Sequence, residues 1–349
     1  MAGGKCPKFG QPVLSPIYHK EAWPGPAGYS WARSSPIGQG LGYSAGMPLL
    51  NAADTAARLP YPELAREVNA LLHDSSVQVP PRLVQALPGG GSLFVMPALD
   101  RRIAITKLIS YTPANAGTGR PAIQGDVVVF DLATGERRLV LDGPTVTARR
   151  TAAVSLLAAQ TLAPNTQGPL LIVGAGVQGR AHLEAFAAGL GVTDVRIASR
   201  SEASARSLAE HARAMGLNAQ VMSDPNAALA DCPLVVTCTP ASGVVLQALP
   251  RPDAFIAAVG AFTPKMVELS PELCRHMAAQ GTVVLDTRDA DHEAGDLLQA
   301  GLNVTQFATL QDVLLSKKNR PASHSGPVLF KSCGWAGWDL AAARLALPI

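Results

Sequence analysis

The chain has 349 residues, of which 48% are hydrophobic and 16% are charged, and its formal net charge at pH 7 is +3. This composition is typical of a globular protein with a large buried core and excludes a disordered chain. So small a net charge gives no indication of nucleic-acid binding. No apolar run reaches the roughly 18–20 residues of a membrane span, and the length favours two domains.

The cysteines are spread widely along the chain and show no Cys-x-x-Cys spacing: Cys6, Cys232, Cys238, Cys274 and Cys333. An odd number of scattered cysteines predicts neither a disulfide framework nor a zinc site, so we expect no bound metal. The first residues lack the apolar segment of a signal peptide. Together these features predict a reducing, cytoplasmic setting.

The first 145 residues predict a mainly antiparallel β region that follows an irregular arm. Residues 1–45 are rich in Gly, Pro and Ser and show no periodicity, whereas a helical pattern covers residues 61–72. The segment Ala133-Thr-Gly-Glu136 is a hairpin signal between two apolar runs. Strands are predicted at residues 91–97, 103–111, 126–132 and 137–141.

From residue 145 onward the pattern changes to helices that alternate with buried strands. A long Ala/Leu-rich helix is predicted over residues 145–163, and the C-terminal segment carries one more strand and a final helix. The apolar strands cover residues 170–173, 195–199, 234–239, 254–259 and 282–286. Such alternation predicts a doubly wound parallel sheet with right-handed crossovers. The expected fold class is therefore α/β, with a Rossmann domain at residues 146–314 and a second α/β domain.

A glycine motif follows the first of these strands. Gly174-x-Gly176-x-x-Gly179 stands directly before a helical pattern in which Leu183 and Phe186 share one face. Gly174 permits a tight turn, Gly176 lets a pyrophosphate approach the backbone, and Gly179 lets the helix pack closely on the strand. The free N–H groups at the start of the helix would bind the phosphates. The motif predicts dinucleotide binding, with a purely structural turn as the alternative.

The end of the second strand indicates which nucleotide is bound. In NAD-binding folds an acidic residue at this point accepts hydrogen bonds from the ribose, whereas an arginine accommodates the 2′-phosphate of NADP. Here the strand ends in Ser199-Arg200-Ser201, and Glu202 is the nearest carboxylate. Arg200 and two hydroxyls suit a phosphate. We predict NADPH as the cofactor, with NADH as the alternative. In the structural interpretation, Arg200 is simply a solvated arginine at a helix start and does not contact the nucleotide.

Three cationic side chains stand in unusual surroundings. Lys107 shares a strand face with isoleucines, which is costly unless an anion meets its charge. The alternative is that this face is exposed to solvent, or that the lysine side chain extends to the edge of the face and keeps its ammonium in water. Arg149 and Arg150 lie near a helix start, where the dipole disfavours cations, so one of them is expected to face an anion unless both are solvated.

Arg82 precedes a strand and is ambiguous by itself. Together with a hydride carrier, cations from three segments would suit a small carboxylate substrate. His182 lies on the helix after the glycine motif, where we expect a structural role. The sequence contains no G-x-S-x-G nucleophile motif and no H-E-x-x-H zinc motif.

Short motifs follow one another in a specific order from about residue 60 to the end of the chain. They are Val95-Met-Pro-Ala98, Thr106-Lys-Leu108, the hairpin with Thr134-Gly135, Leu141-Asp-Gly143, Thr147-Ala-Arg-Arg-Thr-Ala-Ala-Val-Ser155, Val173-Gly-Ala-Gly-Val-Gln178, Val259-Gly-Ala261, Gly295-Asp296 and Phe330-Lys-Ser332. In these motifs the chain resembles the ornithine cyclodeaminase/μ-crystallin family. The arm before residue 45 is longer than the resemblance leads one to expect.

The resemblance implies a domain organisation and a set of site residues. Residues 1–145 and 315–349 would form a substrate-binding and dimerisation domain beside the Rossmann domain, and the protein would be a homodimer. The substrate carboxylate would be held by Arg82, Lys107 and Arg150, and the start of the helix that contains Thr151 would border the cofactor. The predicted cofactor-binding residues are Thr151, Gly174, Gly176, Val177, Gln178, Ser199, Arg200, Ser201, Thr239, Val259 and Gly260.

One departure from the family pattern bears on the reaction. Cyclodeaminases carry an aspartate base two residues after the glycine that corresponds to Gly260, and here Phe262 stands in its place. Phe262 and Arg200 favour the ketimine reductase branch. We therefore predict NAD(P)H-dependent reduction of Δ1-pyrroline-2-carboxylate and Δ1-piperideine-2-carboxylate to L-proline and L-pipecolate. Lys107 is the catalytic candidate, because it could protonate or hydrogen-bond the imine nitrogen.

Three alternatives stay open at this point. The first is an amino-acid dehydrogenase of the alanine dehydrogenase kind. The second is an ornithine cyclodeaminase. The third is an NADP-dependent protein of μ-crystallin type that binds a small ligand without turning it over.

Overall fold

The computed structural model describes residues 48–347 except 116–117, 241 and 317–325. The arm predicted at residues 1–45 and Cys6 therefore lie outside the described residues. The prediction of an α/β fold with a parallel doubly wound sheet is confirmed. The described elements form two sheets, one antiparallel and one parallel, together with a two-strand pair.

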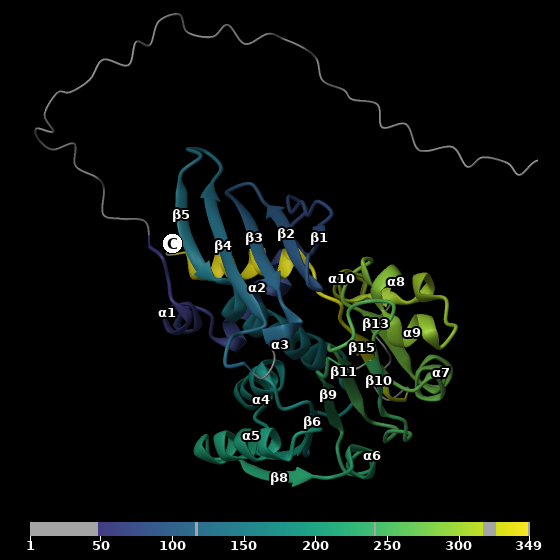
Figure 1. Ribbon diagram of the computed structural model, residues 1–349. Coiled ribbons are helices and arrows are strands. Elements are labelled where there is room, and N and C mark those ends of the chain that lie inside the picture. Colours follow the sequence, from purple (N-terminus) through teal and green to yellow (C-terminus); the bar gives the residue numbers. More distant parts are fainter. Residues whose placement is uncertain (1–47, 116–117, 241, 317–325, 348–349) are drawn as a thin grey trace, which may run out of the picture. The chain divides into compact units, whose positions relative to one another are not determined.

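The antiparallel sheet contains five strands in chain order: β1 (Leu83–Leu87), β2 (Gly91–Leu99), β3 (Ile103–Tyr111), β4 (Ile123–Asp131) and β5 (Arg137–Asp142). The hairpin predicted between β4 and β5 is present. Residues 103, 105, 107 and 109 alternate with more exposed neighbours and are all buried, as the period of two predicts. This buried face packs on α11 (Ala336–Ala346), the yellow helix behind the sheet in Figure 1, and α11 in turn contacts α2 (Tyr61–Leu72).

The parallel sheet has eight strands in the order β14-β13-β15-β11-β9-β6-β7-β8. Their bounds are β6 (Leu170–Val173), β7 (Asp194–Ala198), β8 (Asn218–Met222), β9 (Leu234–Thr237), β11 (Phe255–Ala258), β13 (Thr282–Leu285), β14 (Ala308–Thr309) and β15 (Val328–Lys331). The direction of strand succession reverses between β6 and β9. In such sheets ligands bind in the crevice outside the carboxyl ends of the strands at this reversal.

The central strands of the parallel sheet are apolar throughout because both of their faces are buried. In β6, Leu170 and Ile172 belong to one apolar cluster, whereas Leu171 and Val173 belong to a second cluster on the opposite face. The first cluster continues into α2, α11 and the inner face of the antiparallel sheet. One continuous core therefore joins the two sheets.

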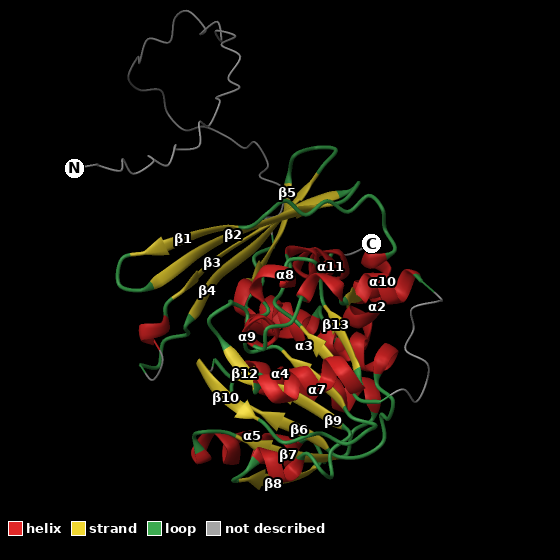
Figure 2. Ribbon diagram, turned by 90° about the vertical axis from the view of Figure 1, so that its right-hand side faces the viewer, coloured by secondary structure: helices red, strands yellow, loops and turns green. Residues whose placement is uncertain are grey.

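The helix α3 (Gly143–Leu162) connects the two parts of the fold. It contacts α2 and α4 (Val177–Leu190) and strands of both sheets, and Figure 2 shows it among the central elements. The carboxylate of Asp142 caps its first turn by accepting a hydrogen bond of 2.8 Å from the N–H of Thr145. The side chains that α3 presents to both parts are therefore fixed in relation to each other.

The remaining described helices are all shorter than α3, and the two longest of them contact strands of the parallel sheet. They are α1 (Ala52–Ala57), α5 (Glu202–Ala214), α6 (Pro225–Ala228), α7 (Pro271–Gln280), α8 (Ala290–Glu293), α9 (Gly295–Gln299) and α10 (Leu310–Leu315), with 3-10 turns at Pro113–Asn115 and Val304–Gln306. Among the helices that the structure describes, none combines the length and apolar character needed to cross a bilayer.

The C-terminal segment adds a strand to the parallel sheet and a helix that packs on the antiparallel sheet. We expected it to belong with the N-terminal half, but β15 is hydrogen-bonded between β11 and β13 in the parallel sheet. The reason is that Val328, Leu329 and Phe330 are all buried, as a strand covered on both faces requires. The following helix α11 then packs on the antiparallel sheet. The chain thus returns to the Rossmann sheet before it completes the other part of the fold.

Several strands escaped the sequence patterns. β1 and β8 lie at sheet edges and are largely exposed, so their side chains do not alternate between core and solvent. β10 (Ser242–Leu246) and β12 (Val267–Leu269) form a separate parallel pair. Short or exposed strands of this kind carry little periodic signal.

Candidate active site

The glycine motif forms the turn between β6 and α4. Gly174 has a φ of +115°, and a side chain there would press on the carbonyl oxygen of Cys238 at 2.9 Å. A Cβ on Gly179 would collide with the carbonyl of Gly174, so the helix lies close to the strand. Gly176 caps α4 without any side-chain hydrogen bond, and a Cβ there would meet nothing within 4 Å. Open space at a free helix N-terminus fits the pyrophosphate of a dinucleotide.

The tip of β7 presents a cation without a carboxylate beside it. Arg200 is exposed and forms no ion pair with the described residues. Glu202, the nearest acid, is engaged with Arg206 at 2.6 Å on the surface of α5. The hydroxyl of Ser201 caps α5 by accepting a hydrogen bond of 3.3 Å from the N–H of Ser204. This arrangement suits a 2′-phosphate better than a ribose hydroxyl.

The other predicted cofactor residues lie on three neighbouring segments. Thr239 follows β9, and Val259 and Gly260 follow β11, so all three stand at the carboxyl ends of adjacent strands. Thr151 lies on α3, where its hydroxyl donates to the carbonyl of Thr147 at 2.8 Å. The glycine turn, Thr239, Val259 and Gly260 therefore lie at the carboxyl ends of the adjacent strands β6, β9 and β11, where the strand order reverses.

A buried cluster of charges joins three elements: β3, α3 and α11. Lys107 on β3 is 1% exposed, and its Nζ lies 2.7 Å from Oδ2 of Asp339 on α11. Arg150 on α3 lies against the other oxygen, with its Nε 3.2 Å from Oδ1. Asp339 therefore holds Lys107 and Arg150 together. We refer to these three residues as the Asp339 cluster.

Burial changes the acidity of Lys107. Loss of hydration lowers the pKa of Lys107 to about 8; the nearby Arg150 also lowers it, whereas the carboxylate of Asp339 raises it. A lysine whose pKa lies this close to neutrality can donate a proton near physiological pH.

Arg82 approaches the Asp339 cluster from the loop before β1. It forms an ion pair with Glu293 on α8 and lies near enough to Lys107 to lower the pKa of that lysine. It also stands near Asp289, a carboxyl group whose pKa is raised by burial. The structure thus brings the three cations predicted from separate segments into one neighbourhood.

The position of Gly334 places the Asp339 cluster at the carboxyl edge of the parallel sheet. Gly334 follows β15, and its N–H donates to Asp286, which follows β13, at 2.8 Å. A Cβ on Gly334 would lie only 3.3 Å from a guanidinium nitrogen of Arg150. Since β15 neighbours β11, the guanidinium lies on the same edge of the sheet as Gly260.

Sequence patterns missed Asp339 and Glu293 as the partners of the three cations. Asp339 carried a signal, because it is a single acid within the otherwise apolar run from Trp338 to Ala343. A buried helix rarely holds an acid without a cationic partner. Glu293 stands among other acids in residues 289–296, so nothing singled it out.

Arg149 and His182 have local roles away from the Asp339 cluster. The guanidinium of Arg149 lies 3.9 Å from the ring centre of Tyr61 and donates to the carbonyl of Leu59 at 2.7 Å. Both ring nitrogens of His182 are engaged, one by the carbonyl of Gln178 at 2.8 Å and one by the hydroxyl of Ser155 at 3.0 Å. Burial lowers the pKa of His182 to about 4, which agrees with the structural role expected for it.

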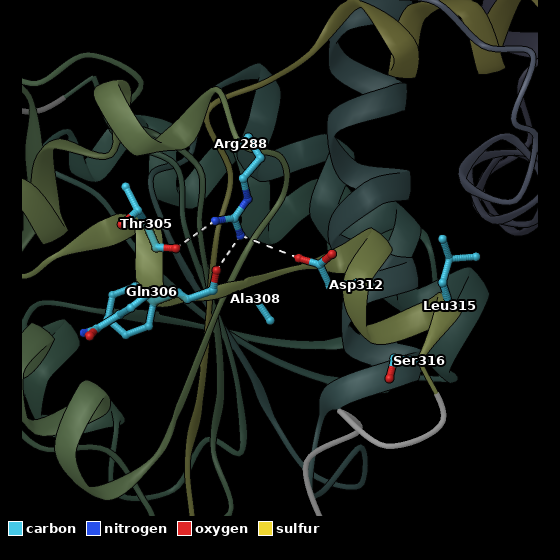
Figure 3. A pocket seen from close by; sticks show the side chains of 8 residues that line it. Arg288, Thr305, Gln306, Ala308, Asp312, Leu315 and Ser316 are labelled. Carbon is cyan, nitrogen blue, oxygen red and sulfur yellow. Dashed lines mark hydrogen bonds and ion pairs between the residues drawn. The ribbon is translucent and has the colours of Figure 1, made fainter.

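A surface pocket beside α10 contains none of the predicted site residues. Figure 3 shows Arg288 at its centre. The guanidinium donates to the carbonyls of Thr305, at 3.1 Å, and Phe307, and it pairs with Asp312 at 3.7 Å. These contacts tie the segment at residues 305–307 to α10.

The described cysteines are all buried and free: Cys232, Cys238, Cys274 and Cys333. Burial raises the pKa of each of these thiols, so they are protonated at neutral pH. Within the part of the chain that the structure describes, no group of three His, Cys, Asp or Glu side chains could hold a metal ion.

Two bacterial relatives match the chain over most of its length. Delta(1)-pyrroline-2-carboxylate reductase 1 of Burkholderia multivorans is 39% identical over 307 residues, which cover 86% of this chain and 94% of the relative. The Delta(1)-pyrroline-2-carboxylate/Delta(1)-piperideine-2-carboxylate reductase of Azospirillum brasilense is 40% identical over 305 residues, which cover 86% and 95%.

The fold has a close counterpart among solved structures. The Delta(1)-pyrroline-2-carboxylate reductase of Thermococcus litoralis, solved in complex with NADH and L-proline, superposes with a TM-score of 0.79 at 23% sequence identity, over 86% of this chain and 96% of that chain. A sequence model of the ornithine cyclodeaminase/mu-crystallin family matches residues 49–347. The chain belongs to the ornithine cyclodeaminase/mu-crystallin family.

Proposed function

We propose that the protein reduces the cyclic ketimines Δ1-pyrroline-2-carboxylate and Δ1-piperideine-2-carboxylate to L-proline and L-pipecolate with NADPH. The observation that carries this proposal is the buried Asp339 cluster at the carboxyl edge of the Rossmann sheet. It offers a carboxylate substrate two fixed cations, Lys107 and Arg150, with Arg82 close by. The reductase names of the bacterial relatives support the same substrate class.

The cofactor, when bound, supplies the hydride that reduces the imine carbon. The residues that would hold it are Thr151, Gly174, Gly176, Val177, Gln178, Ser199, Arg200, Ser201, Thr239, Val259 and Gly260. Arg200 would bind the 2′-phosphate, and the free N–H groups of α4 would bind the pyrophosphate.

The side chains of the Asp339 cluster would orient the substrate and manage its proton. Arg82 and Arg150 bind the carboxylate, so the adjacent imine carbon is held in a fixed place, and positioning of this kind supplies much of the rate. Lys107 donates a hydrogen bond or a proton to the imine nitrogen, which makes the carbon a better hydride acceptor. Asp339 keeps the ammonium of Lys107 oriented.

Phe262 argues against ornithine cyclisation. Its side chain is half-buried and packs against the second apolar cluster, around strands β11 and β13. A phenyl ring cannot accept a proton, so the base of the cyclodeaminase reaction is absent from this position.

An assay of NADPH oxidation against a panel of substrates tests the proposed function. The panel contains each cyclic imine alone, pyruvate with ammonia, and ornithine with catalytic NAD. We expect turnover with the cyclic imines alone. Turnover only with pyruvate and ammonia would instead indicate an amino-acid dehydrogenase, steady ammonia release from ornithine would indicate a cyclodeaminase, and ligand binding without turnover would indicate a binding protein.

Replacing Arg200 by alanine should raise the Michaelis constant for NADPH by about tenfold or more, because a charge-assisted contact to the 2′-phosphate is lost. The Michaelis constant for NADH should hardly change. Arg206→Ala, an exposed arginine on the adjacent helix, serves as the matched control and should leave both cofactors unaffected. Equal losses for NADPH and NADH in Arg200→Ala would contradict the 2′-phosphate contact.

We also propose that the protein is a homodimer that pairs through the outer face of the antiparallel sheet. On this face Leu108 is 45% exposed and lies opposite Asp126 of β4, and the half-buried Val128 and Phe130 follow along the same strand. Exposed apolar surface on a sheet face marks a site of association. The family resemblance supports the same assembly.

Leu108→Glu should convert the dimer into a monomer at micromolar concentration, because two like charges would then be buried at the interface. Light scattering measures the change. Val221→Glu is the matched control, since Val221 is a similarly exposed apolar residue on β8. A wild-type protein that is already monomeric, or a Leu108→Glu variant that still dimerises, would contradict this interface.

The domain boundaries and the location of the protein also belong to the proposal. Residues 146–314 together with β15 would form the nucleotide-binding domain, and residues 1–145 together with α11 the substrate-binding and dimerisation domain. Free, buried cysteines agree with a reducing cytoplasmic setting.

A further inference from the structure

A fully buried carboxylate ties together the two strand ends that carry Thr239 and Gly260. Glu268, on β12, is 0% exposed. Its Oε1 accepts hydrogen bonds from the N–H and the hydroxyl of Thr239, at 2.6 and 2.9 Å. Its Oε2 accepts from the N–H of Gly260 at 2.7 Å and from the hydroxyl of Thr237 at 3.0 Å. One side chain therefore satisfies four donors from the ends of β9 and β11.

The backbone around this carboxylate is packed too tightly to adjust. A Cβ on Gly260 would lie 2.5 Å from Oε1 of Glu268 and 2.5 Å from the N of Thr239, and it would also collide with the carbonyl of Thr239. The sheet ladder ends with the bond of 2.9 Å from the N–H of Val259 to the carbonyl of Thr237. Beyond that bond, Glu268 links the backbones of Thr239 and Gly260, and neither backbone can move toward the other.

A second buried acid holds Glu268 in place. Oδ1 of Asp296 accepts from the N–H groups of Glu268 and Leu269 at 2.6 and 2.9 Å. Oδ2 of Asp296 lies 2.9 Å from Nζ of Lys331, which donates to the carbonyl of Ala261 at 2.5 Å. The chain of contacts thus runs from β12 through α9 to the end of β15 and returns to the loop after Gly260.

Such a network is a costly way to stabilise a core. Buried charged groups require full hydrogen bonding, and apolar residues of similar volume often stabilise a fold as well or better. In this network the donors to the carboxylate belong to Thr237, Thr239 and Gly260, and the last two are expected to border the cofactor. The 2′-phosphate would instead contact Arg200, for which the described residues show no contact with the network, whereas the glycine turn reaches it only through Cys238, whose thiol donates to the carbonyl of Gly174 at 3.1 Å.

We propose that Glu268 is a positioning residue for hydride transfer. By fixing the separation of Thr239 and Gly260, its carboxylate fixes the wall of the crevice against which the nicotinamide end of the cofactor lies. This inference rests on the proposed reductase function. In this role Glu268 acts through Thr239 and Gly260 and contacts neither substrate nor cofactor.

The variant Glu268→Gln tests the proposal because it keeps the shape of the side chain. Glutamine has one acceptor oxygen, so its NH₂ group would face at least one of the N–H donors of Thr239 and Gly260. We expect kcat with a cyclic imine to fall about tenfold or more, since small misplacements of a reacting group slow transfer steeply. The primary isotope effect from NADPH deuterated at C4 should rise, because hydride transfer becomes more fully rate-limiting.

Binding measurements separate positioning from a general loss of structure. Glu268→Gln should raise the dissociation constant of NADPH. It should change the dissociation constant of 2′-phospho-ADP-ribose, which lacks nicotinamide, by less than about twofold. Glu272 is an exposed acid on α7, so Glu272→Gln is the matched control and should change the dissociation constant of neither ligand. If Glu268→Gln does not fold, Thr237→Val replaces it, because it removes one hydroxyl donor and should lower kcat in the same direction by a smaller factor.

Two results would overturn the positioning role. One is a folded variant with wild-type kcat, isotope effect and NADPH affinity. The other is equal weakening of NADPH and 2′-phospho-ADP-ribose, which would indicate a merely structural acid. If the wild-type enzyme reduces no cyclic imine, the proposed substrate class is wrong; a selective loss of NADPH affinity in Glu268→Gln would still support positioning.

Discussion

Lys107→Ala should reduce kcat/KM for both cyclic imines by an amount equivalent to about 2–4 kcal/mol of transition-state stabilisation. The physical reason is the loss of a buried ammonium that is held in place by Asp339 and that, in the proposed function, donates to the imine nitrogen. Lys107→Arg should not restore activity, because the guanidinium is longer and does not release a proton at neutral pH. NADPH binding, followed by fluorescence, should be nearly unchanged. Near-normal activity of Lys107→Ala would contradict any role of Lys107 in the reaction.

The pH dependence of Lys107 offers a second readout of the same variant. Burial lowers the pKa of Lys107 to about 8, so the ammonium is present below this pH and is lost above it. For the wild-type enzyme kcat/KM should therefore fall as the pH rises through about 8, since kcat/KM reports the free enzyme. The residual activity of Lys107→Ala should lack this descending limb. Titration of the imine itself is common to both enzymes and cancels in the comparison.

Asp339→Ala should be the most destabilising of the single substitutions described. It leaves Lys107 and Arg150 buried beside each other without an anion, and breaking a buried ion pair in this way costs about 3–5 kcal/mol. It also removes the carboxylate that raises the pKa of Lys107, so the descending limb of the pH profile should move to lower pH. Unfolding by urea measures the loss of stability.

Two matched variants show whether the loss of stability comes from unpaired buried charge. Asp253→Ala removes a partly exposed partner of Arg251, and its effect should stay within about 1 kcal/mol. The double variant Asp339→Ala/Lys107→Met should recover part of the stability, because one unpaired charge is then gone. If Asp339→Ala unfolds at the same urea concentration as the wild type, the Asp339 cluster contributes little to stability.

Local patterns predicted those parts of the fold in which one stretch of chain decides the outcome. The isoleucines around Lys107 marked a buried strand face, and that face is buried. The glycine motif specified a turn in which only Gly174 accepts the positive φ and only a bare Gly179 accepts the close helix. In both cases the physical cause lies within a few residues of the pattern.

The charge partners could not be predicted in the same way, because they come from distant parts of the chain. The pattern around Lys107 required an anion, and we expected the substrate to supply it, whereas Asp339 supplies it within the protein. Likewise, Glu268 lies in the three-residue strand β12, whose sequence gives no sign of a special role. Only the folded structure shows that its carboxylate accepts hydrogen bonds from both Thr239 and Gly260. Pairing across the fold depends on how α11 and β12 pack, which no local periodicity records.

The return of the C-terminal segment to both sheets has a consequence for synthesis on the ribosome. Residues 328–331 fill the place between β11 and β13, and α11 then brings Asp339 to Lys107. A nascent chain that lacks these residues has a split parallel sheet, and its buried lysine has no counter-charge. Neither the parallel sheet nor the antiparallel sheet with its buried lysine can therefore complete its folding before α11 is available. Both reach their final form only after α11 has left the exit tunnel.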